Sequence, residues 1–130
     1  MQTILTIEVI AMKVPGPDHP IAIAPAEKRV RVSFAGRTIA DSSRALVLNE
    51  AGYKPVFYIP RADADMALLA RSAHASHCPY KGDASYFTIS AEGRTAENAV
   101  WSYEQPFPAV AAIKDHLAFY PNRVDKIEVE

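Results

Sequence analysis

Chain-breaking residues are spread through this sequence so densely that long helices have little room. Ten prolines and five glycines occur among 130 residues. Proline cannot continue a helix or a central strand, and glycine favours turns, so the elements between them must be short. The sequence therefore predicts many short elements, most of them extended.

Alternation of apolar and polar residues identifies the strands. In residues 29–34 the side chains of Val30, Val32 and Phe34 face one way, and the polar residues between them face the other. Similar patterns recur at short intervals, which predicts about seven short strands after residue 20 and one before it; their short connections favour an antiparallel meander. The expected strands are Thr3 to Ile10, Arg29 to Phe34, Thr38 to Asp41, Arg44 to Glu50, Val56 to Ile59, Ala84 to Ser90, Ala99 to Tyr103 and Val124 to Val129.

Two segments show helical spacing instead. The first starts at Asp63 and Asp65, because carboxylates suit the N-terminus of a helix, and it is expected to end near residues 73–76, before Pro79. The second is expected after Pro106 and Pro108, since proline is tolerated in a first turn. The apolar positions of the two helices are Met66, Leu69 and Ala73, and Val110, Ile113 and Leu117.

These patterns predict a mainly β (or α+β) fold: a small single-domain antiparallel structure with two short helices. Pro15, Gly16, Pro17 and Pro20 interrupt regular structure and mark a border. We expect residues 1–20 to form an N-terminal extension, a strand followed by a proline-rich loop. Residues 21–130 are expected to form the single β-rich domain, a length that suits one hydrophobic core.

Composition and charge make some classes of binding partner unexpected for this chain. The formal net charge is −1, so the basic footprint of a nucleic-acid-binding protein is missing. A single cysteine excludes an intramolecular disulfide, and no apolar run reaches the roughly 18 residues of a membrane span. The start of the chain lacks the features of a secretory signal. We therefore expect a cytoplasmic protein with neither nucleic acid nor membrane as partner.

Four short stretches hold polar and reactive residues that neither a strand nor a helix requires. The densest places an imidazole, a thiol, a phenol and an ammonium within five residues, followed by a glycine. Residues of this kind beside turns are where binding sites tend to lie. The stretches are Gly36-Arg37-Thr38-Ile39-Ala40-Asp41-Ser42, Tyr58-Ile59-Pro60-Arg61 with Asp63, His77-Cys78-Pro79-Tyr80-Lys81-Gly82-Asp83-Ala84-Ser85-Tyr86, and Ala99-Val100-Trp101-Ser102-Tyr103 with Pro106.

At these motifs the sequence resembles a known family, domain of unknown function 427. The resemblance runs from about Val30 to Tyr120, and the motifs follow the family's order. The family has no established reaction, and we treat its nucleotidyltransferase-like label as a name only. The resemblance implies a small β-rich, β-tent-like fold akin to Mss4-like proteins and B-type methionine sulfoxide reductases. The paired Cys-x-x-Cys motifs that hold zinc in those relatives do not occur here, so no metal site is expected.

Cys78 is the candidate nucleophile, because thiolate is the reactive form of cysteine and a neighbouring cation favours that form. His77 or Asp41 is the candidate base. A free cysteine is equally suited to be a small buried apolar residue, and an aspartate before Ser42 suits a turn. Asp63 has the corresponding structural interpretation as a helix cap.

An anionic ligand is the second expectation. Arg61 and Lys81 carry the charge that would hold it, and aromatic side chains would contact a flat ring. Alternation places Trp101 and Tyr103 on one face of a strand, where they can wall a pocket or pack in the core. The expected ligand-binding residues are Arg61, Lys81, Tyr80, Trp101 and Tyr58.

Together these residues suggest a domain that binds a small anionic or nucleotide-like ligand around the Cys-Pro-Tyr-Lys-Gly motif, with catalysis left open. No Walker pattern precedes Lys81, so a P-loop is excluded, and no cofactor is expected. The histidines His74 and His77 with Cys78 fall short of the four ligands of a structural zinc site. The alternative is a non-catalytic structural or interaction domain that forms a homodimer or larger homo-oligomer.

Overall fold

Segments with alternating apolar and polar residues form strands in the computed structural model, which describes residues 12–130. The strands are β1 Ile21–Pro25, β2 Val30–Phe34, β3 Arg37–Ser42, β4 Leu46–Glu50, β5 Val56–Tyr58, β6 Leu69–Cys78, β7 Gly82–Ala91, β8 Arg94–Tyr103, β9 Ala118–Phe119 and β10 Lys126–Val129. Three short 3-10 helices connect them: η1 Arg61–Asp63, η2 Met66–Leu68 and η3 Pro108–Ile113. The mainly β expectation is confirmed.

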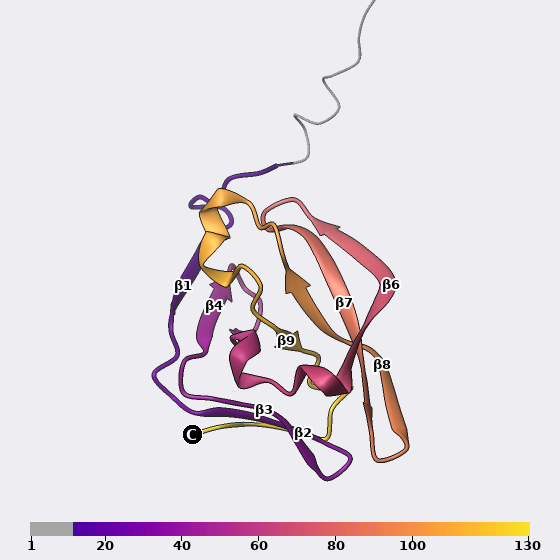
Figure 1. The fold of residues 1–130 in the computed structure, drawn as a ribbon. Helices are drawn as coiled ribbons and strands as arrows, with labels where there is room; N and C mark the ends of the chain where they lie inside the picture. Colours follow the sequence, from indigo (N-terminus) through magenta and orange to yellow (C-terminus); the bar gives the residue numbers. More distant parts are fainter. Residues whose placement is uncertain (1–11) are drawn as a thin grey trace, which may run out of the picture.

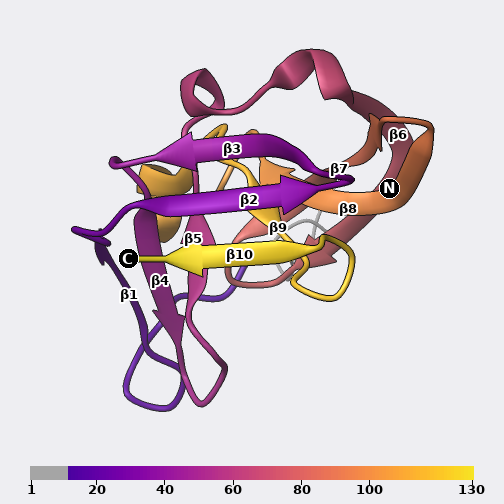
Figure 2. The same ribbon diagram turned by 90° about the horizontal axis from the view of Figure 1, so that it is seen from below.

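The strands form three antiparallel sheets, with strand orders β1-β4-β5, β10-β2-β3 and β6-β7-β8-β9. Only the last is a meander along the chain, because β1 pairs with β4 and the C-terminal β10 pairs with β2. In Figure 1, β1 and β4 lie on one side, β6 to β8 lie on the other, and β2 and β3 run across the lower end. Figure 2 shows β10, β2 and β3 side by side as the sheet that closes this end.

The four-stranded sheet divides the interior into two apolar clusters. Phe87 and Val100 are paired across β7 and β8, and their side chains join the cluster that includes Val30 and Val32 of β2. Tyr86 and Trp101 are the next pair and face the opposite way, because successive side chains of a strand alternate between faces. The second cluster therefore lies between this face and the β1-β4-β5 sheet.

The expected helix after Asp63 is wrong in most of its length. Only Met66–Leu68 is helical, and Leu69–Cys78 forms the ten-residue edge strand β6. The strand pairs with β7, and its residues from Ala70 onward are mostly exposed, so the segment shows no clean alternation. Pairing with a neighbouring strand outweighs a weak local pattern.

Other differences are smaller. The second expected helix exists as the 3-10 helix η3, which buries Val110 and Ile113 but ends before Leu117. Strands β1 and β9 were not expected; both are short. The expected strand at Thr3 to Ile10 lies outside the described residues. Within residues 12–130 no helix is long and apolar enough to cross a membrane.

Candidate functional site

Lys81 is turned into the protein by the tight connection between β6 and β7. The backbone N–H of Lys81 donates to the carbonyl of Cys78 at 3.2 Å, and the next residue, Gly82, has a φ of +108°. A β-carbon on Gly82 would lie 3.4 Å from the carbonyl oxygen of Gln105. The positive φ favours glycine here, while a β-carbon would be in ordinary van der Waals contact with the Gln105 carbonyl. Only 8% of Lys81 is exposed.

Glu50, the last residue of β4, is the partner of this lysine. Lys81 Nζ lies 2.5 Å from Glu50 Oε1, and His19 Nε2 lies 2.7 Å from Glu50 Oε2. The His19 ring is stacked on Tyr80, with ring centres 3.9 Å apart. Burial by itself would raise the pKa of Glu50, but hydrogen bonds from Lys81 and His19 outweigh it, so the pKa lies below its ordinary value.

The Lys81–Glu50 pair opens into a pocket with a volume of about 390 Å³, which we call the tyrosine pocket. Its aromatic walls come from four parts of the chain: the β4–β5 loop, β5, β8 and the segment after β9. The lining residues are Leu48, Glu50, Tyr53, Val56, Tyr58, Lys81, Trp101, Tyr103 and Tyr120.

The aromatic groups of the tyrosine pocket hold one another in place. Trp101 Nε1–H donates to the Tyr58 hydroxyl at 3.4 Å, and the Trp101 and Tyr120 rings lie 4.5 Å apart. Burial raises the pKa values of Tyr58 and Tyr103 well above the ordinary range, and burial with the hydroxyl of Tyr86 raises that of Tyr120 to about 12. The phenols therefore stay protonated near neutral pH and offer hydrogen bonds rather than negative charge.

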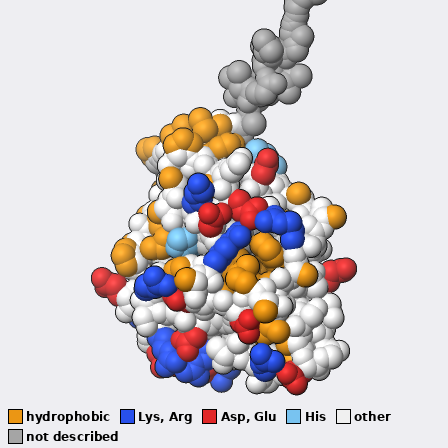
Figure 3. Space-filling view, viewed as in Figure 1, with side chains coloured by type: hydrophobic (Ala, Val, Ile, Leu, Met, Phe, Trp, Pro, Cys, Tyr) orange, Lys and Arg blue, Asp and Glu red, His pale blue; other side chains and the backbone are white. Residues whose placement is uncertain are grey.

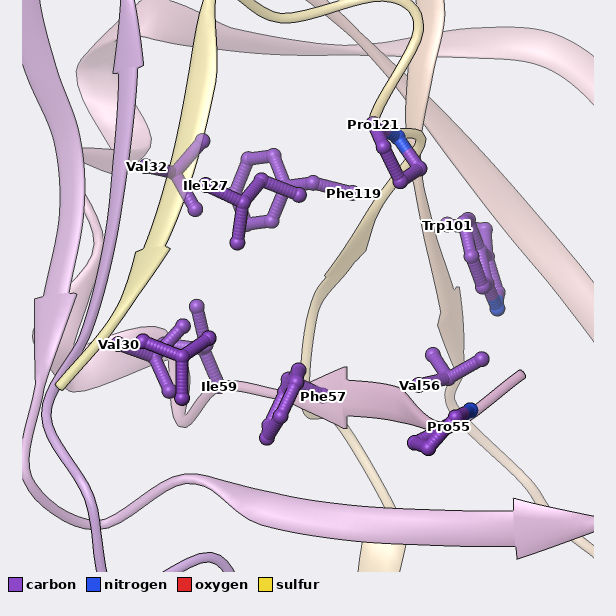
Figure 4. Close-up of a pocket in the computed structure, with 11 residues that line it drawn as sticks. Val30, Val32, Pro55, Val56, Phe57, Ile59, Trp101, Phe119, Pro121 and Ile127 are labelled. Atoms are coloured by element: carbon purple, nitrogen blue, oxygen red, sulfur yellow. The ribbon is translucent and has the colours of Figure 1, made fainter.

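A second, apolar cavity of about 300 Å³ adjoins the tyrosine pocket. Figure 4 shows its side chains converging on a common hollow from β2, β5, β8, β9 and β10. All the residues that line it are apolar, and two of them, Val56 and Trp101, also line the tyrosine pocket. The charged and hydrogen-bonding side chains thus line the tyrosine pocket, whereas apolar residues line the second cavity.

Residues 22–130 match the family described as a domain of unknown function, DUF427. The chain belongs to this family. A search of curated proteins finds no match. The resemblance expected from the motifs is therefore confirmed over nearly all of the described chain, and it leaves the function of the DUF427 domain to be argued from the site itself.

Arg61 does not share the tyrosine pocket of the DUF427 domain. Its Nη2 donates to Ser102 Oγ at 3.0 Å and to Glu104 Oε2 at 2.8 Å. Ser102 alternates with Trp101 and Tyr103 along β8, so Arg61 lies on the opposite face of the four-stranded sheet from Lys81. The expectation that both cations hold one ligand is wrong, because the sheet separates them.

Arg61 belongs instead to a polar cluster centred on Glu104. Arg71 donates to both Glu104 oxygens, and Ser85 Oγ donates to one of them at 2.9 Å. These hydrogen bonds lower the pKa of Glu104 from 4.5 to about 2, and those from Arg71 contribute most. Both guanidinium groups also lie over the Phe87 ring, at 5.4 and 5.1 Å. We call Arg61, Arg71, Ser85 and Glu104 the arginine cluster.

The three candidate catalytic residues lie apart. Cys78 packs partly buried against the second apolar cluster and is not among the described residues that line the tyrosine pocket. His77, its neighbour in β6, points to the other face and lies 2.7 Å from Asp83. Asp41 lies in a different sheet and accepts two hydrogen bonds from Arg29. Asp41 therefore lies in a different sheet from Cys78, and strand alternation puts His77 and Cys78 on opposite faces of β6.

Asp63 and the histidines have other partners than those expected. Asp63 accepts hydrogen bonds from Ser42 and Arg44, and it caps no α-helix. His74 packs edge-on against Tyr86, and His116 Nδ1 lies 2.9 Å from the carbonyl of Lys114. In residues 12–130 no three His, Cys, Asp or Glu side chains are grouped as metal ligands.

Acidic and basic side chains lie next to one another on the face of the DUF427 domain seen in Figure 3. Ion pairs of the described residues join positions far apart in sequence, such as Arg44 with Asp63 and Arg61 with Glu104. Positive charge on this face is therefore interspersed with negative charge rather than gathered into one broad patch.

Sequence reasoning found Lys81, Tyr58 and Trp101, and it offered Tyr103 as either a pocket wall or a core residue. It missed Glu50, His19 and Tyr120. Glu50 ends a strand before a turn, and His19 lies in a proline-rich loop, positions where a polar residue needs no explanation. Both meet their partners 31 residues away. Only the alternation of Trp101 with Tyr103 carried a signal, and it correctly placed both on one face.

Proposed function

We propose that this domain binds a small, flat, ring-bearing molecule with an anionic or hydrogen-bond-accepting group in the tyrosine pocket. The acceptor lies at the Lys81 ammonium, and the ring packs against Trp101 and Tyr120. One observation carries the proposal: a lysine that is 92% covered faces an aromatic-walled space rather than solvent or a filled core. Aromatic walls with a few placed polar groups are the usual composition of a small-molecule site.

The hydrogen-bonding capacity of Lys81 supports this proposal. An ammonium group has three N–H donors, and among the described residues Glu50 is its hydrogen-bond partner. Two donors remain for a ligand. The phenol groups of Tyr58, Tyr103 and Tyr120 add neutral hydrogen-bonding groups around the same space.

Charge balance limits the ligand's charge. Glu50 already neutralises Lys81, and Arg61 lies across the sheet, so nothing in the pocket would compensate a triphosphate. A single carboxylate or a polar ring substituent fits better. The position of Cys78 outside the lining supports binding rather than thiol catalysis as the function.

The test uses benzoate, 4-hydroxybenzoate, nicotinate and adenosine monophosphate as probes in titration calorimetry. We expect at least one ring acid to bind with a Kd between micromolar and millimolar. A Lys81→Gln/Glu50→Gln double variant removes both charges without leaving one buried alone, and we expect its affinity to fall at least about tenfold. Lys126→Gln, which changes an exposed lysine of β10, is the matched control. Failure of all four probes to bind, or equal binding by the double variant, contradicts the proposal.

Self-association is the competing proposal, favoured by the ten-residue edge strand β6. An exposed edge can pair with a second chain. The pairing of β6 with β7 shifts in register between Arg71 and Ala75. This irregularity makes β6 a poorer edge for pairing with a second chain. Light scattering on the purified protein, with and without residues 1–20, measures the mass directly; a monomer in both cases rejects this proposal.

A further inference from the structure

The apolar cavity beside the tyrosine pocket is lined by side chains from five strands of the fold. Val30, Val32 and Ile59 in its inner wall are at most 1% exposed, whereas Val129 is 38% exposed and Ile127 is partly exposed. The hollow therefore presents apolar surface to water through its outer residues. Covering this surface with a ligand is favourable.

Trp101 joins the two spaces. Its indole N–H donates to Tyr58, which lines the tyrosine pocket, and Trp101 is also one of the residues that line the apolar cavity. Figure 4 shows Trp101 and Val56 at one end of the hollow, opposite Val30 and Val32. A molecule held against Trp101 in the tyrosine pocket thus lies next to the entrance of the apolar cavity.

We infer that the ligand is amphipathic, with a ring acid in the tyrosine pocket and an alkyl or aryl tail that passes Val56 and Trp101 into the apolar cavity. This inference rests on the proposed function and adds the substrate class. Each space alone is near the lower end of the size range of ligand pockets, whereas the two together give a site of ordinary size.

The chemistry of the two spaces favours one divided molecule over a uniformly polar or uniformly apolar one. A polar ligand would leave the apolar cavity uncovered, and a hydrocarbon would leave the donors of Lys81 unused. The tail needs no hydrogen bonds, since all the residues that line its cavity are apolar. Length of the tail, rather than its polarity, then determines affinity.

The probes are benzoate, 4-ethylbenzoate and 4-butylbenzoate, measured by titration calorimetry. We expect affinity to rise by about fourfold per added methylene as long as the tail is covered by the cavity. Intermolecular NMR contacts should join the tail to Phe119 and Ile127, and the ring to Tyr120.

Blocking the cavity provides the decisive comparison. In Val129→Trp the larger side chain at the rim is expected to fill the hollow, so that benzoate binds as before and the gain with tail length disappears. Val14→Trp is the matched control, because Val14 is 73% exposed and lies outside both linings. If Val129→Trp is unstable, Ile127→Phe makes the same test from inside the cavity.

The outcomes separate the two proposals. Binding of benzoate with no gain from longer tails overturns the amphipathic ligand and leaves the proposed function standing. A gain that survives in Val129→Trp and Ile127→Phe also overturns it, because the tail then lies elsewhere. If none of the three acids binds while another probe of the proposed function does, only this inference is rejected; if no probe of either set binds, both are rejected.

Discussion

The two faces of the four-stranded sheet carry the same kind of ionic group in different surroundings. On one face Glu50 is shared by Lys81 and His19, and on the other Glu104 is shared by Arg61 and Arg71. The first group opens into an aromatic pocket, whereas the second is packed over the Phe87 ring. An ion pair therefore does not identify a binding site; the space beside it does.

Removing Lys81 should give the largest effect. Lys81→Met leaves the nearly buried Glu50 carboxylate without its main partner, and we expect a loss of about 3 kcal/mol in the free energy of unfolding. The Lys81→Met/Glu50→Gln double variant should recover part of it. Urea denaturation measures both, with Lys126→Met as the control, expected within about 0.5 kcal/mol of wild type. Equal stability of Lys81→Met and wild type would show that the pair is not formed in solution.

The turn that places Lys81 should be nearly as sensitive. Gly82→Ala puts a β-carbon at a φ of +108° and 3.4 Å from the carbonyl of Gln105, which we expect to cost about 2 kcal/mol. Gly52→Ala, at a turn with open space around it, is the matched control. Thermal unfolding of the two variants gives the comparison, and a Gly82→Ala protein as stable as Gly52→Ala would argue against the positive φ at Gly82.

The arginine cluster should make the free energy of unfolding depend on pH in the acidic range. The pKa of Glu104 is lowered from 4.5 to about 2, so the unfolded chain takes up this proton first as the pH falls. The stabilisation is therefore present above about pH 4.5 and is lost towards pH 2. Since the cluster contacts solvent, we expect a loss of about 1 kcal/mol for wild type.

Urea titrations at pH 6, 4 and 2.5 measure this loss. Glu104→Gln should show a shallower decline than wild type over the same range, while the exposed Glu97→Gln should keep the wild-type slope. Identical slopes for wild type and Glu104→Gln would mean that the cluster does not hold the carboxylate in its charged form.

The smallest effect separates the two faces. Arg61→Gln loses the bonds to Ser102 and Glu104, but Arg71 still pairs with Glu104, so we expect a cost of about 1 kcal/mol. Affinity for benzoate should stay within about twofold of wild type, because Arg61 lies across the sheet from the pocket. A large loss of affinity for benzoate in a folded Arg61→Gln protein would show that the two faces of the sheet contribute to one site.

Local alternation explains why most of the fold was predictable. Residues such as Val30, Val32 and Phe34 indicate which face of a strand is buried. The strands β2, β3, β4, β5, β7 and β10 and the second half of β8 were found in this way. The strand β6 was missed because it lies at a sheet edge, where most of its side chains are exposed and need not alternate. The pairing of β10 with β2 joins distant residues and leaves no local pattern.

The site was only partly predictable for a related reason. Lys81 and Trp101 stood out because a strand or turn does not require them, but their neighbours Glu50 and Tyr120 look ordinary in sequence. Arg61 was assigned to the wrong face, since only the register of β8 shows that Ser102 points away from Trp101. The side of the sheet on which a residue lies depends on how the strands pair, and a short sequence motif does not show this pairing.

A ligand is expected to bind on the Lys81 face of the four-stranded sheet and not on the Arg61 face. Trp101 is the single tryptophan, so its indole N–H gives one isolated signal in a proton–nitrogen NMR spectrum. Titration with 4-butylbenzoate is expected to shift this signal together with the backbone signals of Lys81 and Tyr120, while Arg61, Arg71 and Glu104 stay in place. Shifts confined to the arginine cluster, or an unmoved Trp101 signal at saturating ligand, would contradict the account.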